Sequence, residues 1–202
     1  MKKFCLLLCA ISLMFGVAGS AGATVLDFEG IGYVQDNARL TSLYGGFNWQ
    51  EFGYVNKNAH IPPIPDITDL GVQNGTISGH YAAFNWSSVL DNIIQADFLF
   101  DLNRVWIASA WETDFELTVK GGIGNSIVYS KPIELKVGSA GWVDFGFLGI
   151  NKLIFDADSA QFVMDDFTYN PTPVPEPASM LLLGLGLMGV SGVGRKRLFK
   201  RR

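Results

Sequence analysis

The chain has 202 residues, among them fifteen Lys and Arg, nineteen Asp and Glu, eight prolines and two cysteines. Setting aside the basic residues near the two ends leaves seven basic and eighteen acidic residues in the segment 24–170, a net charge of about −11. This charge argues against nucleic acid or an anionic lipid surface as a partner. A segment of this length can bury one hydrophobic core without disulfides.

The N-terminus has the pattern of a signal peptide. Lys2 and Lys3 precede an apolar run over 4–17, and small residues follow. Ala21-Gly-Ala23 fits the A-x-A pattern of a signal peptidase site, so residues 1–23 are predicted to be removed and the mature chain to begin at Thr24. Both cysteines lie in the removed segment, which leaves the mature chain without a thiol.

The segment 24–170 shows short alternating runs and no helical period. A first strand is predicted over 24–29, with Leu26 and Phe28 on one face and Asp27 and Glu29 on the other. Residues 30–79 are rich in loop-forming residues. Further strands are predicted at 52–55, 80–85, 95–102, 104–111, 115–120, 126–130, 133–137, 142–147, 152–156 and 161–169. These short strands, separated by turn residues, predict an all-β fold, an antiparallel β-sandwich of the jelly-roll kind.

The last thirty residues form three parts. Four alternating prolines make 171–177 a stiff linker, because each proline fixes its own φ and favours an extended predecessor. The uncharged run 178–194 would span about 25 Å as a helix and is predicted to be a single transmembrane helix. Six basic residues in 195–202 are expected to hold that end in the cytoplasm.

This three-part order resembles the PEP-CTERM sorting signal of Gram-negative bacteria. The resemblance implies an exosortase as processing partner, which would cut near the Pro-Glu-Pro. It implies a domain anchored at the inner membrane and facing the periplasm, which then passes to the cell surface or to extracellular polysaccharide. The residues that carry the resemblance are the sorting motif Pro175, Glu176 and Pro177 and the basic anchor Arg195, Lys196 and Arg197.

Three motifs of the segment 24–170 resemble surface β-sandwiches that often precede such tails. They are Leu26-Asp-Phe-Glu29, Tyr44-Gly-Gly-Phe-Asn-Trp49 and Phe162-Val-Met-Asp-Asp-Phe-Thr-Tyr169. Such sandwiches look like carbohydrate-binding modules in outline, and this likeness implies a fold more than a ligand.

Two hypotheses for the function follow, and a third stays open. The first is a non-catalytic surface or matrix protein associated with exopolysaccharide, and the second is a lectin-like module that binds it. A secreted hydrolase is the third, although the sequence has no His-Glu-x-x-His, no Gly-x-Ser-x-Gly and no carboxylate pair that stands out. No catalytic residue is predicted.

Aromatic side chains in loop-rich sequence are the candidates for a sugar platform, because sugars stack on exposed rings. Trp106 and Trp111 fall on opposite faces of one apolar strand, so at least one is expected in the core, and Trp142 is expected there as well. Core packing is the alternative for every candidate. The candidate platform residues are Trp49, Trp86, Tyr44 and Tyr54.

A calcium ion is predicted where the first and last strands meet. In a jelly-roll these strands lie side by side, which would bring Asp27 and Glu29 towards Asp165. An unpaired carboxylate on the apolar face of Asp165 would be costly, and a hard cation would offset that cost. The alternative is that Asp165 accepts hydrogen bonds from backbone N–H groups at a bulge or turn.

Overall fold

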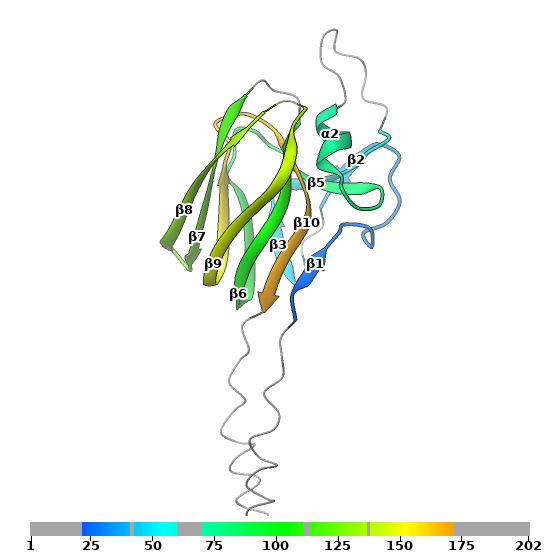
Figure 1. Cartoon of the computed structure of the whole chain (residues 1–202). Coiled ribbons are helices and arrows are strands. Elements are labelled where there is room, and N and C mark those ends of the chain that lie inside the picture. Colours follow the sequence, from blue (N-terminus) through cyan, green and yellow to red (C-terminus); the bar gives the residue numbers. More distant parts are fainter. Residues whose placement is uncertain (1–21, 41–42, 60–69, 111–113, 137, 172–202) are drawn as a thin grey trace, which may run out of the picture. The chain divides into compact units, whose positions relative to one another are not determined.

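The computed structural model describes residues 22–40, 43–59, 70–110, 114–136 and 138–171 (Figure 1). These residues form ten strands and one short helix, and every strand pairing is antiparallel. The predicted all-β, antiparallel fold is therefore confirmed. The elements are β1 Thr24–Leu26, β2 Asn37–Arg39, β3 Phe47–Gln50, β4 Phe52–Asn56, α2 Leu70–Gly75, β5 Tyr81–Asn85, β6 Asn92–Ser109, β7 Phe115–Ile123, β8 Ser126–Leu135, β9 Ala140–Asp156 and β10 Phe162–Pro171.

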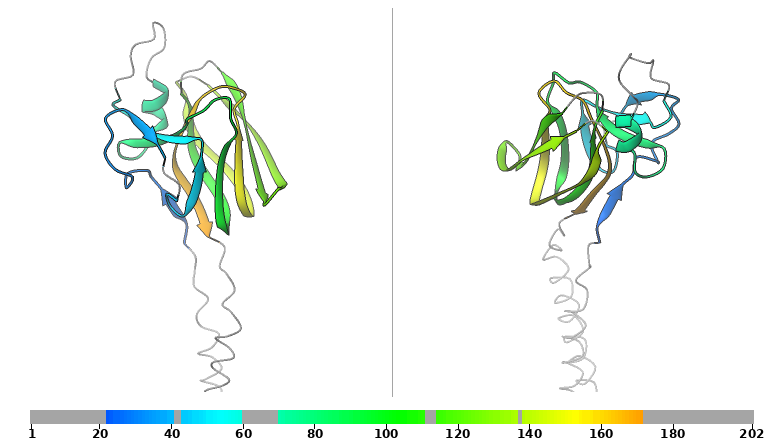
Figure 2. Two further views of the ribbon diagram at one scale, coloured as in Figure 1. Left: turned by 180° about the vertical axis from the view of Figure 1, so that it is seen from behind. Right: turned by 45° about the horizontal axis from the view of Figure 1, so that its top comes forward.

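The strands are ordered β2-β4-β5-β10-β6-β9-β7-β8 in one sheet, with β1 added to β10 and β3 added to β6. Two of them are unusually long: β6 has 18 residues and β9 has 17. The first part of β6 pairs with β3 and its later part with β10, while β9 runs along its other edge. The two long strands therefore hold the rest of the sheet together (Figure 2).

The sheet folds over on itself. Register shifts between β6 and β9, over Gln95–Arg104, mark the irregular stretch of their ladder. The ring of Tyr129 in β8 stacks on Phe147 in β9, with centroids 4.8 Å apart and planes 10° apart, although β8 pairs only with β7 in the ladder. Strand β8 thus contacts β9 beyond its ladder partner β7, which itself pairs with the last part of β9, and this closure of the sheet fits a β-sandwich.

Aromatic rings fill the space between the layers. Phe47, which is fully buried, lies 5.0 Å from Phe100, 5.6 Å from Phe167 and 4.9 Å from Tyr169 between ring centroids. Edge-to-face pairs of this kind add stability beyond the area that they bury. Because these rings come from β3, β6 and β10, one aromatic cluster joins the middle of the sheet to the strand added to β6.

The structure differs from the predicted elements in several places; the strands predicted at 126–130 and 133–137 are one strand, β8, and β2 and β3 were not predicted. Strand β1 ends at Leu26 instead of Glu29, because Phe28 has a φ of +59° and leaves the extended conformation. The two strands predicted at 95–102 and 104–111 are one strand, β6, since Asn103 does not interrupt it. The segments 142–147 and 152–156 likewise belong to one strand, β9, in which Gly146 and Gly149 take positive φ where the register of the β6–β9 ladder shifts.

Helix α2 was not expected, because six residues are too few to show a helical period. It packs outside the sheet on β6 and β10, where Val72, Ala110 and Val163 form part of a second, smaller core. Among the residues described, no helix is both long and apolar enough to cross a bilayer. The predicted transmembrane helix 178–194 lies outside those residues.

Gly53 in β4 allows close packing of two aromatic rings. A Cβ at this position would lie 2.6 Å from Cε3 of Trp86, 2.7 Å from Cε1 of Phe84 and 2.8 Å from the backbone oxygen of Ala38. We expect Gly53→Ala to lower the free energy of unfolding by about 1–3 kcal/mol, because the backbone oxygen cannot move as a side chain can.

Urea unfolding of the purified protein measures this loss. Gly141→Ala in β9 is the matched control, since nothing lies within 4 Å of a Cβ there. A loss for Gly53→Ala no larger than for Gly141→Ala would contradict the packing.

Candidate functional site

Trp49 and Tyr54, two of the four candidate platform residues, lie in the core. Their exposed fractions are 4% and 7%. The indole N–H of Trp49 donates to the backbone oxygen of Tyr44 at 2.9 Å, so its polar atom is satisfied internally. The prediction that these rings form a sugar platform is therefore wrong, because a ring enclosed on both faces offers no surface to a ligand. Trp49 faces inward with Phe47 by the two-residue alternation of β3.

Tyr44 is half-buried and packs against the same cluster. Its ring stacks on Phe28 with centroids 5.4 Å apart. Burial raises the pKa of the Tyr44 phenol to about 12, and the negative charge of Asp27 adds to this effect. Tyr44 is therefore a neutral side chain that anchors a loop to the core, and only part of its surface is open to solvent.

Trp86, which follows β5, remains a candidate platform. Its side chain is half-buried, and the guanidinium carbon of Arg39 lies 5.1 Å from the ring centroid. Arg39 also forms an ion pair with Glu51 at 3.3 Å. The charge beside the ring is thus neutralised by a neighbouring carboxylate.

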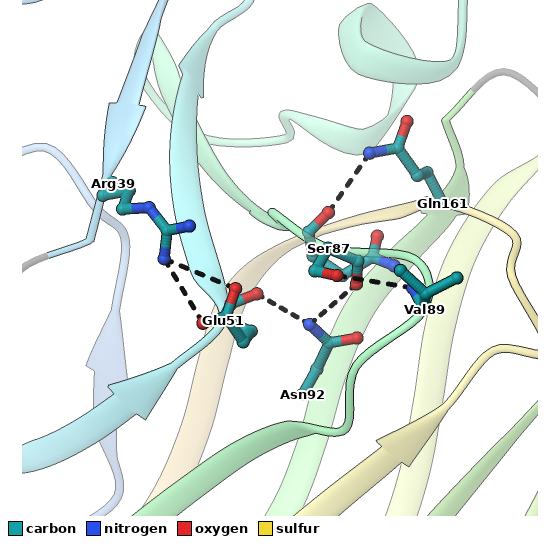
Figure 3. A network of polar contacts seen from close by, with 7 residues as sticks. Arg39, Glu51, Ser87, Val89, Asn92 and Gln161 are labelled. Carbon is teal, nitrogen blue, oxygen red and sulfur yellow. Dashed lines mark hydrogen bonds and ion pairs between the residues drawn. The ribbon is translucent and has the colours of Figure 1, made fainter.

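A polar network that includes Glu51, Ser87 and Asn92 is shown in Figure 3, and it adjoins Trp86 in the chain. The backbone oxygen of Glu51 accepts from the backbone N–H of Trp86 at 2.8 Å and from Nδ2 of Asn92 at 2.6 Å. Asn85 is fully buried: its Nδ2 donates to the oxygen of Ala160, and its Oδ1 accepts from the N–H of Phe162. These bonds satisfy buried polar groups and fix the backbone on which the indole is mounted.

Trp106 and Trp142 form a pair on the outer face of the sheet, and the sequence analysis did not predict this pair. Trp142 was expected in the core but has an exposed fraction of 37%, and Trp106 is half-buried. The two residues are directly opposite in the β6–β9 ladder. The alternation in β9 could have revealed this, since Trp142 shares a face with exposed Asp144 while Phe145 faces the core.

Asp165 lies where the calcium site was predicted and is fully buried. Its Oδ2 accepts from the backbone N–H of Ser78 at 2.9 Å and from the Ser78 hydroxyl at 3.1 Å, and its Oδ1 accepts from the N–H of Asp166 at 2.7 Å. The β6–β10 register shifts just after Asp165, and Asp166 has a φ of +47°. The carboxylate thus accepts backbone hydrogen bonds at a bulge, which was the alternative to calcium.

The Glu29 carboxylate binds the backbone of a different loop. Its Oε1 accepts from the backbone N–H groups of His80 and Tyr81 at 2.6 and 2.7 Å. Gly79, with a φ of +51°, makes room for this carboxylate, because a Cβ there would lie 2.1 Å from Cδ of Glu29. Asp27 is exposed and accepts from the N–H of Glu29.

The predicted calcium set is therefore wrong. Strands β1 and β10 do lie side by side, as expected. However, within the described parts of the chain, no three His, Cys, Asp or Glu side chains form a group that could hold a metal ion. The physical reason is that backbone N–H groups already occupy the oxygens of Glu29 and Asp165, the two buried or half-buried carboxylates of the three.

Burial raises the pKa of Asp165 to about 7, while the hydrogen bonds from Ser78 and Asp166 oppose this rise. A neutral Asp165 fits the geometry. Its Oδ2 can then donate to the Ser78 hydroxyl, whose own proton is directed to Oδ1 of Asp166 at 2.8 Å. Protonation of Asp165 thus removes a buried charge, and the side chain keeps its hydrogen bonds.

The C-terminal tail carries a recognised sorting motif. Residues 173–197 match the family model described as the PEP-CTERM protein-sorting motif. This range contains the predicted sorting motif and the basic anchor, and it confirms the resemblance seen in the sequence. Both lie outside the described residues.

Comparison with solved structures gives distant likenesses. An exo-β-agarase structure matches with a TM-score of 0.45 and 8% identity, over 78% of this chain and 26% of that chain. The CBM22-1 xylan-binding domain of Paenibacillus barcinonensis Xyn10C matches with a TM-score of 0.41 and 12% identity, over 79% and 100% of the two chains. TmCBM61 in complex with β-1,4-galactotriose has a TM-score of 0.37 and 11% identity, over 65% and 92%.

This chain thus spans about a quarter of the agarase. Because the TM-scores are below 0.5, these likenesses establish neither ligand nor activity for this chain. No curated protein matches the sequence.

Proposed function

We propose that this chain is an exported, non-catalytic protein of the cell surface or extracellular matrix, which is sorted by its tail and associates with exopolysaccharide. The observation that carries the proposal is the PEP-CTERM motif over 173–197. The signal-peptide pattern at the opposite end supports it. An aromatic surface on the β-domain supports the association with polysaccharide.

The proposed organisation has five parts. Residues 1–23 are the signal peptide, and 24–170 are a jelly-roll-like sandwich. A linker with the Pro-Glu-Pro follows over 171–177, then a transmembrane helix over 178–194 and a cytoplasmic basic tail over 195–202. The domain first faces the periplasm, and an exosortase then releases it towards the cell surface.

A lectin-like module is the more specific form of this function. Two tryptophans favour it, because Trp86 and Trp142 each keep part of their surface open and each lie beside an arginine. In both, the guanidinium lies over the indole ring, so a sugar that packs on the open part of the ring meets hydrogen-bond donors.

Mass spectrometry of the protein recovered from a host that has an exosortase tests the sorting. We expect a mature chain that begins at Thr24 and ends near Pro175–Pro177, and we expect it in the extracellular polysaccharide fraction. Replacing Arg195, Lys196 and Arg197 with neutral residues is expected to weaken membrane retention before processing.

Surface material that still contains Arg202 would indicate a permanent anchor instead of a sorting signal. Processed protein that separates completely from the polysaccharide fraction would contradict the association with exopolysaccharide.

A further inference from the structure

The outer face of β6 and β9 carries an aromatic pair, one exposed residue and one half-buried, whose positions are fixed by the ladder. Trp106 and Trp142 are cross-strand partners, with ring centroids 5.7 Å apart and planes at 75°. Directly opposite residues of an antiparallel pair share one face of the sheet. Of the four tryptophans that the structure describes, Trp142 is the most exposed, at 37%.

The region of helix α2 fixes the position of this pair. The indole N–H of Trp106 donates to the backbone oxygen of Asn74 at 2.7 Å, and Nδ2 of Asn74 donates to the backbone oxygen of Gly138 at 3.1 Å. Trp106 is therefore locked in one orientation, and Trp142 rests against it. A ligand that binds here meets a surface that loses little conformational entropy on binding.

Arg104 stacks over the ring of Trp142. The guanidinium carbon of Arg104 is 4.1 Å from the centroid of the Trp142 ring. In the described residues the ion pairs within 4.0 Å are Arg39–Glu51 and Lys120–Asp156. Arg104 is in neither, although exposed Asp144 is its direct cross-strand partner on the same face.

This arrangement contrasts with Trp86, where the stacked Arg39 is paired with Glu51. At Trp142 the donors of Arg104 and the acceptors of Asp144 both stay available to a ligand. Donors and acceptors beside an exposed indole match a sugar, whose C–H face is apolar and whose hydroxyl groups both donate and accept.

We propose that Trp142, Arg104 and Asp144 form a binding site for a neutral polysaccharide; this inference rests on the proposed function and names its site. A sugar ring packs on the exposed part of the Trp142 indole, while its hydroxyls bond to Arg104 and Asp144. Trp106 is a positioning residue that holds Trp142.

The charge favours a neutral ligand over an acidic one. The segment 24–170 has a net charge of about −11, which repels an acidic polymer at long range. A neutral polymer is not repelled.

Binding of the full chain to immobilised polysaccharides tests the site. The protein is purified in a zwitterionic detergent that has no sugar headgroup, and the probes are xylan, galactan and a β-glucan, with alginate as the uronate polymer. We expect binding to at least one neutral polysaccharide and none to alginate. Trp142→Ala is expected to weaken that binding at least 10-fold, and Arg104→Ala and Asp144→Ala several-fold each.

Tyr33→Ala is the matched control, because it removes an aromatic ring from a position that is 82% exposed and outside the proposed site, and we expect binding to change less than 2-fold. Thermal unfolding of each variant identifies loss of fold. The exposed positions Arg104 and Asp144 keep the test decisive if Trp142→Ala unfolds.

The possible results distinguish failure of the proposed site from failure of the proposed function. Binding of a neutral polysaccharide that persists in the Trp142, Arg104 and Asp144 variants would overturn the site and leave the proposed function standing. Binding of alginate alone would overturn the neutral ligand class. Absence of binding to every probe would overturn the site, and the function fails as well only if the processed protein also separates from the extracellular polysaccharide.

Discussion

Trp49→Ala is expected to lower the free energy of unfolding by about 3–5 kcal/mol, the usual loss for a large aromatic residue removed from a core. The ring centroid of Trp49 lies 5.5 Å from that of Phe52, 5.6 Å from Phe28 and 5.8 Å from Phe167. These neighbours come from three separate parts of the chain, so they cannot close the cavity by one local movement. The backbone oxygen of Tyr44 would also lose one of its two donors and keep only the N–H of Phe47.

Urea unfolding of the fragment 24–171, followed by circular dichroism, measures this loss. Trp142→Ala is the matched control, because its ring is 37% exposed and we expect a loss of less than about 1 kcal/mol. If Trp49→Ala unfolded like the wild type and only weakened sugar binding, Trp49 would be a platform residue after all.

The second large effect is a dependence of stability on pH that comes from Asp165. Its pKa is raised by burial from 3.8 to about 7 in the folded protein. Between these values the folded state holds a proton that the unfolded state has lost. The contribution of Asp165 to stability is therefore fully present below about pH 4 and is lost as pH rises through 7, by on the order of 4 kcal/mol over the whole window.

Asp165→Asn is expected to abolish most of this slope, because the amide stays neutral at every pH. It can still donate to the Ser78 hydroxyl and accept from a backbone N–H. The measurement is urea unfolding at pH 5, 6, 7 and 8 for both proteins. Asp144→Asn, at an exposed position, serves as control and should keep the wild-type slope. An equal slope in Asp165→Asn would show that another group is responsible.

The features that depend on local pattern could be predicted from the sequence. Alternation and turn residues were sufficient for the all-β fold, and the jelly-roll fold that they suggested implied that the first and last strands lie side by side, as Thr24 and Tyr169 do. The sorting tail was predictable for the same reason, because its three parts are contiguous and need no tertiary structure to be recognised.

The features that depend on a single backbone angle or on packing could not be predicted. One residue with positive φ, Phe28, ends β1, after which the Glu29 carboxylate binds the loop at His80 instead of a metal. Likewise, the loop-rich sequence around Trp49 concealed a four-residue strand, β3, that faces the core. Helix α2 covers only part of the outer face, and this leaves Trp142 open.

Strand β10 is the last element of the described domain, yet it lies in the middle of the sheet. It pairs with β1 and β5 on one edge and with β6 on the other. During synthesis, β1 therefore stays unpaired until β10, more than a hundred residues further along the chain, has been made. A chain that crosses a membrane from its N-terminus would lack its central strand until Pro171 emerged. The order of the strands would thus keep the chain unfolded during transport and allow the fold to close only when transport of the domain is complete.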